Sequence, residues 1–259
     1  MTFPLLLAAA ALCSDGRGIP VRVPLAPADL GVLPEACERT EASFEARTAI
    51  LVANDDLYGS VDLGAGLRGR LVIAERTWLS LWTPSLQYRY VANATVTADR
   101  VSLGGGALGI HRRLVLGNVA VAPFVRMLLP TETGFDRATR WGFDLGMAVT
   151  APLGERLEIV GGYSMTYLAT ASGGGALQLL SASASTDVLW HRWDWLAFGG
   201  GLGARLALAD RRPFESLDPR IAVRLTPSAS FFANVSAALP LFGRDRTDVG
   251  IGLSVGLAR

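Results

Sequence analysis

From about Glu41 to the C-terminus, large apolar residues alternate with polar or small ones at a period of two. The last segment shows the pattern clearly. In Val249–Leu257, every odd-numbered residue is Val, Ile or Leu, and every residue between them is Gly or Ser. Successive side chains of a β-strand point to opposite faces of the sheet, so this pattern predicts strands with one apolar and one polar face. We therefore expect an all-β protein.

The alternation continues through about twelve segments, separated by turn and loop residues. The predicted strands span residues 42–53, 60–73, 77–89, 101–115, 118–130, 140–152, 156–169, 177–190, 194–208, 217–226, 230–239 and 247–258. Most of them reach ~10 residues or more, which is the length with which a tilted strand crosses a bilayer. Strands of soluble proteins average about five or six residues.

A soluble β-sandwich would show the same alternation, with its large residues in a core and its polar residues in water. Composition favours a membrane barrel instead. Lys is absent and charged residues make up only 18% of the chain, so there is little polar surface to solvate two open sheets. Only helices and closed barrels cross lipid without leaving backbone groups unpaired. We therefore predict a closed antiparallel transmembrane β-barrel.

The connections between the predicted strands alternate in length. Glu75–Arg76, Leu116–Gly117 and His191–Trp193 are tight, whereas Tyr90–Arg100 and Thr131–Thr139 are longer. Bacterial outer-membrane barrels have short turns on the periplasmic side and longer loops outside. The alternation therefore predicts that both termini lie in the periplasm.

Aromatic residues near these connections are expected at the two membrane interfaces, where amphipathic rings gather in such barrels. Ordinary core aromatics at strand ends are the alternative interpretation. The candidate interface aromatics are Trp78, Trp190 and Trp195 near tight turns, and Tyr88, Trp141 and Tyr167 near longer loops.

The N-terminal part of the chain differs from the rest. Residues 1–13 contain the apolar run Leu5–Ala11 followed by small residues, which predicts a secretory signal peptide. Residues 14–40 are rich in proline and have no sustained period, which predicts a periplasmic tail or a short plug. If Cys13 leaves with the signal peptide, Cys37 is a lone thiol. If both remain, a Cys13–Cys37 disulfide would suit an oxidising compartment, and two unpaired cysteines are the alternative. Residues 41–259 would form the barrel.

With these features in place, the chain resembles bacterial outer-membrane β-barrel proteins of the porin-like, transporter type. The resemblance is architectural over most of the chain. Ala122–Gly134 is also similar to a Leu-Pro-Thr-Gly signature at a strand-to-loop junction in transporter barrels, some tied to aromatic degradation, with Glu132 and Thr133 interrupting it. Barrels of this type usually end in Phe or Trp, whereas this chain ends in Arg259. The resemblance implies outer-membrane lipid and the barrel-assembly machinery as partners, and export through the periplasm to the bacterial outer membrane.

Residues that could support catalysis are few. A lipid hydrolase built on a barrel needs a Ser–His pair near the outer leaflet, facing lipid. Of the two histidines, His191 lies on a predicted periplasmic turn and His111 lies toward the periplasmic half of its strand. We therefore expect no enzymatic activity, no metal site and no cofactor. The near balance of 24 basic and 23 acidic residues also gives no reason to expect nucleic-acid binding.

The charged residues on the polar face are the most informative candidates, because they would line the interior of the barrel. Charges in that position either line a water-filled pore or pair with one another and close it. The two signs are about equally represented, which argues against a strongly ion-selective channel. The lumen-lining candidates are Asp62, Arg68, Arg70, Asp144, Glu158, Asp187, Arg205, Arg220, Arg224 and Asp248.

The leading functional hypothesis is an outer-membrane porin-like channel or uptake protein through which small solutes diffuse passively. Selectivity would depend on the interior Arg, Asp and Glu residues and on the loops Tyr90–Arg100 and Thr131–Thr139. The second hypothesis is a non-conducting structural or surface-interaction barrel, closed by ion pairs and by residues 14–40. An outer-membrane lipid hydrolase is a third and weaker hypothesis.

Overall fold

The structure is a computed structural model that describes residues 40–51, 59–92, 97–130, 140–172, 175–193, 195–208, 214–228, 230–239 and 249–258. The regular elements in these ranges are all β-strands. Within the same ranges, no helix is long and apolar enough to cross a membrane. The predicted signal peptide, the predicted tail or plug, Cys13 and Cys37 lie outside the described residues.

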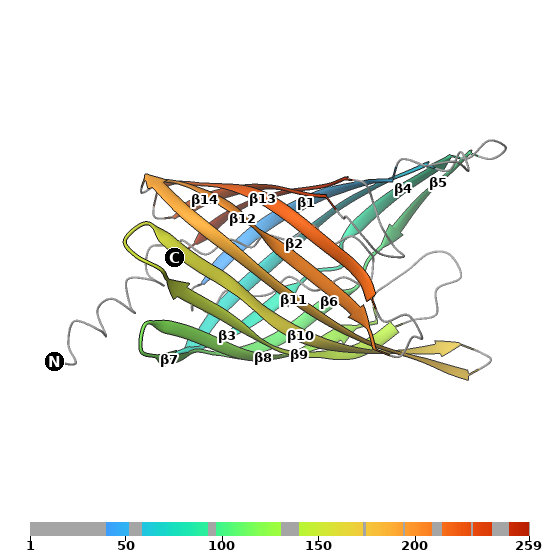
Figure 1. Cartoon of the computed structure of the whole chain (residues 1–259). Helices are drawn as coiled ribbons and strands as arrows, with labels where there is room; N and C mark the ends of the chain where they lie inside the picture. The colour runs from blue at the N-terminus through green and yellow to red at the C-terminus, as the bar shows by residue number, and fades with distance from the viewer. Residues whose placement is uncertain are drawn as a thin grey trace.

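The strands lie side by side around a closed barrel (Figure 1). Their bounds are β1 (Glu41–Leu51), β2 (Gly59–Ala74), β3 (Thr77–Trp82), β4 (Leu86–Ala92), β5 (Thr97–Leu103), β6 (Gly106–Arg112), β7 (Leu114–Leu116), β8 (Val119–Leu129), β9 (Arg140–Pro152), β10 (Leu157–Ser172), β11 (Gly175–Trp193), β12 (Leu196–Ala207), β13 (Phe214–Ser228), β14 (Phe231–Ala238) and β15 (Val249–Ala258).

Closure of the barrel depends on β1, which pairs antiparallel with both β15 and β2. From β2 the sheet continues through β3, β6 and β8, and then in chain order to β15. Two strand positions in the barrel are each occupied by several short strands. β3 and β4 pair with successive parts of β2 and together occupy one position. β5, β6 and β7 together occupy the next position. Counted in this way, the barrel has 12 antiparallel strands. The predicted fold class is confirmed.

The interruption between β3 and β4 has a local cause. Pro84 has no backbone N–H to donate to a neighbouring strand. The chain is held there by Thr83 instead, whose N–H donates to the Leu67 carbonyl over 3.0 Å and whose hydroxyl oxygen accepts from the Leu67 N–H over 3.0 Å. The sequence predicted one continuous strand over 77–89, and the structure divides it into two that pair with different halves of β2.

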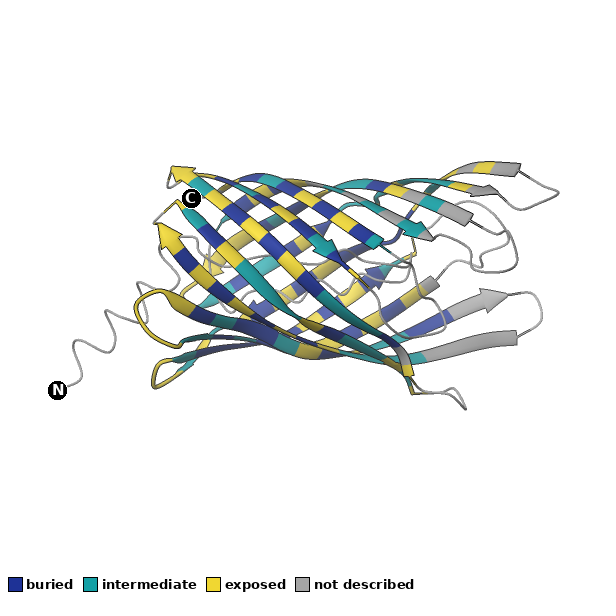
Figure 2. Cartoon of the chain, turned by 45° about the horizontal axis from the view of Figure 1, so that its top comes forward, coloured by how far each residue is buried: buried dark blue, intermediate teal, exposed yellow. Residues whose placement is uncertain are grey.

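Burial alternates along the strands, as the banded ribbons of Figure 2 show. In β10, Tyr163 and Met165 are 50% and 43% exposed on the outside, whereas Ser164 between them is 1% exposed. In β15, Leu253 is exposed and Ser254 is buried. Most large apolar side chains therefore cover the outside, and most of the buried charged and polar residues face the interior, which is the reverse of a soluble protein.

The tight turns share one end of the barrel. Glu41 at the start of β1 pairs with Ala258 at the end of β15, and also with Arg70 near the β2–β3 turn. The start of β1 and the end of β15 therefore lie at the same end of the barrel as the β2–β3 turn (Figure 1). Arg76 and Gly117, in the β2–β3 and β7–β8 turns, have φ values of 59° and 63°. We call this end the tight-turn end. Its periplasmic orientation stays a prediction.

Candidate functional site

A row of inward-facing residues crosses the barrel wall from strand to strand. Each member is the cross-strand partner of the next, so the row follows the slant of the tilted strands around the inner wall, beginning with Glu41 at the tight-turn end. The row consists of Glu41, Arg70, Ser80, Gly109, Arg126, Asp144, Thr166 and Ser181. The alternation of the strands places these residues on the inside. Arg126 and Asp144, for example, each lie between two outward-facing apolar neighbours.

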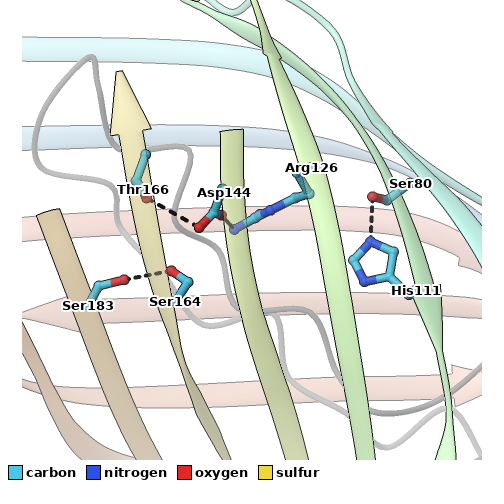
Figure 3. Close-up of polar contacts among 7 residues, drawn as sticks. All are labelled: Ser80, His111, Arg126, Asp144, Ser164, Thr166 and Ser183. Atoms are coloured by element: carbon cyan, nitrogen blue, oxygen red, sulfur yellow. Dashed lines mark hydrogen bonds and ion pairs between the residues drawn. The ribbon is translucent and has the colours of Figure 1, made fainter. Parts of the chain in front are cut away.

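Arg126 on β8 and Asp144 on β9 form the central ion pair of this row (Figure 3). Their side chains are 0% and 2% exposed. Asp144 Oδ1 also accepts a hydrogen bond from Thr166 Oγ1 over 3.2 Å. The guanidinium of Arg126 lies 4.8 Å from the Trp82 ring centroid and 4.7 Å from that of Phe124, so it is held between two aromatic rings and a carboxylate. We call Arg126, Asp144, Thr166, Trp82 and Phe124 the arginine clamp.

Ser80 and His111 lie next to the clamp. Ser80 Oγ and His111 Nε2 are hydrogen-bonded at 2.6 Å (Figure 3). The imidazole also stacks on the Trp78 ring, with 5.2 Å between the ring centroids. Both side chains are about 1% exposed and face the interior rather than lipid. His111 Nδ1 has no hydrogen-bond partner among the described residues. The Ser80–His111 pair therefore faces the interior of the barrel, whereas a lipid hydrolase would need such a pair to face lipid.

Gly109 makes room for these contacts. A Cβ atom at this position would lie 2.5 Å from Arg126 Cγ and 2.8 Å from Ser80 Oγ, closer than side chains tolerate. Gly201 on β12 plays the same part between Asp187 on β11 and Arg220 on β13, since a Cβ there would collide with the Asp187 carboxylate and the Thr186 carbonyl. An inward-facing glycine has no side chain, so the side chains of the two flanking strands can contact one another over its backbone.

The second buried ion pair spans Gly201. Arg220 Nε donates to Asp187 Oδ1 over 2.5 Å, and its Nη2 donates to Oδ2, so the guanidinium grips the carboxylate in a bidentate manner. At the tight-turn end, Arg70 Nε lies 3.1 Å from Glu41 Oε1, and His191 Nε2 lies 3.1 Å from Glu158 Oε2. Interior charges of opposite sign therefore meet on several sides of the barrel.

The structure places the predicted lumen-lining residues as follows. Arg205 is partly buried on β12, and the side chains of Asp62 and Asp248 lie outside the described part. The other seven are less than 9% exposed and lie on the inward face: Arg68, Arg70, Asp144, Glu158, Asp187, Arg220 and Arg224. The strands bring Asp187 together with Arg220, and they bring Asp144 together with Arg126, which was not among the candidates.

The candidate interface aromatics divide into two groups. Trp141, Trp190 and Trp195 are 44–49% exposed on the outer surface, and Tyr88 and Tyr167 are partly exposed. Trp78 is a correction, because it is completely buried and faces the interior against His111. Its proximity to a tight turn suggested the interface, but it shares the inward face of β3 with Ser80 and Trp82.

Sequence reasoning also missed Arg126, Ser80 and Glu41 as interior residues. The signal for Arg126 was present, since it is the one charge in Val119–Leu129 and alternates with the outward Val125 and Met127. The surrounding apolar residues hid it, because both faces of this strand carry large side chains. In the part of the chain that is described, no group of three or more His, Cys, Asp or Glu side chains could hold a metal ion.

Comparisons with known proteins agree with this architecture. No protein-family model matches the sequence, and no curated protein matches it. Among solved structures, an outer-membrane channel from Pseudomonas putida F1 superimposes with a TM-score of 0.65 at 15% identity, over 88% of this chain and 97% of that one. The translocator domain of the autotransporter NalP from Neisseria meningitidis gives 0.53 at 12% identity, over 99% and 93%. The chain therefore has the fold of bacterial outer-membrane β-barrels. The same fold occurs both in a channel and in the translocator domain of an autotransporter.

Proposed function

We propose that this protein is a narrow outer-membrane channel through which small polar solutes diffuse passively. The observation that carries the proposal is the contrast between the two faces of one closed sheet. The outside presents Leu, Ile, Val and aromatic side chains, whereas the inside presents paired Arg and carboxylate groups. A polar interior inside an apolar shell is the arrangement that lets water and polar solutes cross lipid.

The pairing of the interior charges determines the kind of channel that we propose. Arg126 faces Asp144 and Arg220 faces Asp187, so the field of each cation is balanced nearby by an anion. A wall of this kind does not strongly favour ions of one sign. The fold shared with the Pseudomonas channel supports a channel-like role, and it does not indicate the solute.

The dense packing around the arginine clamp favours the second candidate, a barrel that does not conduct. Arg126, Trp78 and His111 are all at most 1% exposed, so interior side chains pack closely around them at this level of the barrel. Under the channel hypothesis, this level is the constriction. Under the alternative, it is a permanent plug of paired charges.

Planar-bilayer recording of the purified protein separates these two functions. We expect the wild-type protein to open small, weakly selective conductances. Replacing both members of the clamp pair (Arg126→Ser with Asp144→Ser) should raise the single-channel conductance several-fold, because two large side chains leave the narrowest level together. The matched control is Met127→Ala with Leu145→Ala, on the same two strands but facing outward, which should leave the conductance unchanged.

A correctly folded wild-type protein that never conducts would contradict the channel hypothesis and leave the non-conducting barrel as the better account. If the wild-type protein conducts but the double variant, Arg126→Ser with Asp144→Ser, conducts no better than the outward-facing control, the clamp pair is not the narrowest level of the channel.

A further inference from the structure

The end of β11 carries an unusual group of exposed side chains. Trp190, Trp193 and Trp195 are 44%, 49% and 49% exposed, and the rings of Trp193 and Trp195 stack with centroids 5.4 Å apart and planes 4° from parallel. Arg192 lies among them, with its guanidinium carbon 5.1 Å from the Trp193 ring centroid and 5.9 Å from that of Trp190. We call these four residues the rim cluster.

A shift in strand register creates the rim cluster. The pairing of β11 with β12 slips between His191 and Trp193, so Arg192 has no direct partner on β12. His191 points inward to Glu158, whereas Trp190, Arg192 and Trp193 are all exposed. Such irregularities re-aim side chains that a regular strand would send to opposite faces. Here the irregularity places a cation and two indoles on the same outer surface.

The surface next to the rim cluster indicates its depth in the membrane. Trp190 pairs laterally with Leu157 and Phe198, which are 41% and 39% exposed, so an apolar band continues across the neighbouring strands. This band suits acyl chains. Arg192 lies two residues further toward the tight-turn end, which is roughly 7 Å along a strand. The guanidinium therefore lies just beyond the apolar band, at the level expected for lipid headgroups.

We propose that Arg192, with Trp190 and Trp193, binds the phosphate of an anionic phospholipid. Within the described ranges, no carboxylate forms an ion pair with Arg192. The indole faces hold the guanidinium by cation–π contacts and leave its N–H edge able to donate to phosphate oxygens in a fork. The neighbouring β9–β10 turn adds the exposed Arg156 and Glu155, and its Arg156 carbonyl accepts the His191 N–H over 2.8 Å.

Brominated lipids test this proposal, since bromine quenches tryptophan fluorescence at short range. The full chain carrying Trp141→Phe, which removes an exposed indole far from the rim cluster, is reconstituted in phosphatidylcholine vesicles. Either brominated phosphatidylglycerol or brominated phosphatidylcholine is then added at equal mole fraction. We expect phosphatidylglycerol to quench more strongly, and this preference to fall as salt screens the phosphate. Trp78 and Trp82 are buried inside the barrel and contribute an unquenched background.

The variants assign the effect to one residue. Arg192→Gln should abolish the preference for phosphatidylglycerol. Arg112→Gln, an exposed arginine on β6 for which no contact with an indole is found among the described residues, should retain it. Equal quenching by the two lipids in the Trp141→Phe protein would overturn the proposal. An equal loss of the preference for phosphatidylglycerol in the Arg192→Gln and Arg112→Gln variants would overturn it as well. The comparison of the two lipids needs no arginine variant, so it decides the matter even if Arg192→Gln fails to fold. Because the readout does not involve conductance, its result is independent of the channel hypothesis.

Discussion

Replacing Asp144 by Leu should destabilise the barrel by about 3–5 kcal/mol, because it removes the carboxylate from a buried ion pair and leaves the Arg126 guanidinium without it. Both side chains are almost completely excluded from solvent, so water cannot replace the lost partner. The change also removes the acceptor of the Thr166 hydroxyl. Urea unfolding followed by tryptophan fluorescence would measure the loss in free energy of unfolding.

Two further variants give this prediction its controls. Asp99→Leu, at an exposed position of β5, should change the free energy of unfolding by less than ~0.5 kcal/mol. The double variant Arg126→Met with Asp144→Leu should recover most of the loss, since apolar residues of similar volume often replace a buried ion pair without cost. If Asp144→Leu costs no more than Asp99→Leu, the arginine clamp does not stabilise the interior.

Leu145→Arg should cost about 2–4 kcal/mol of stability, because it places a charge on the lipid-facing side of the wall near the middle of β9. Leu145 follows Asp144 directly in the chain, yet it is 53% exposed on the outer surface whereas Asp144 is buried inside. β9 therefore accepts a charged side chain on its inward face, whereas we expect a charged side chain on its outward face to destabilise the barrel. Unfolding from vesicles, with the same fluorescence readout, measures the difference.

Leu153→Arg is the matched control for this second prediction. Leu153 is 55% exposed but lies in the turn between β9 and β10, where an arginine can reach water. Its replacement should cost only about 0–1 kcal/mol. Equal costs at positions 145 and 153 would show that the outside of β9 does not contact hydrocarbon.

The strand pattern could be predicted from the sequence because each strand divides its residues between lipid and the interior. The range 140–152 was predicted with the bounds that the structure gives to β9, and most other ranges differ by a few residues. The breaks after Trp82 and Leu103 were missed, although the phase of the alternation reverses at each of them while the hydrogen-bonding partner changes. Leu81 and Leu103 face outward before the breaks at odd positions, whereas Leu86 and Leu108 face outward after them at even positions. Two short runs of opposite phase were therefore interpreted as one strand.

The interior could be predicted only in part, for a related reason. Periodicity assigns a residue to a face, and so it indicated Asp187 and Arg220 as interior residues. It does not say which of them meet, since that depends on register and on bare stretches such as Gly201. Trp78 was predicted wrongly because its proximity to a tight turn suggested a membrane interface, although the alternation along β3 places it inside. Size and polarity alone could not separate a tryptophan at the rim from one stacked on His111.

The central claim is that alternate side chains of one closed sheet face lipid and the barrel interior. Spin labels at single cysteines in place of Tyr163, Ser164, Met165, Leu253 and Ser254, with Cys13 and Cys37 replaced by Ala, test it in vesicles. We expect collisions with dissolved oxygen to be frequent at 163, 165 and 253, and rare at 164 and 254, with a water-soluble nickel complex excluded from the first three. If the nickel complex reaches 163, 165 and 253, or if neither reagent does, those side chains do not face lipid and the barrel account is wrong.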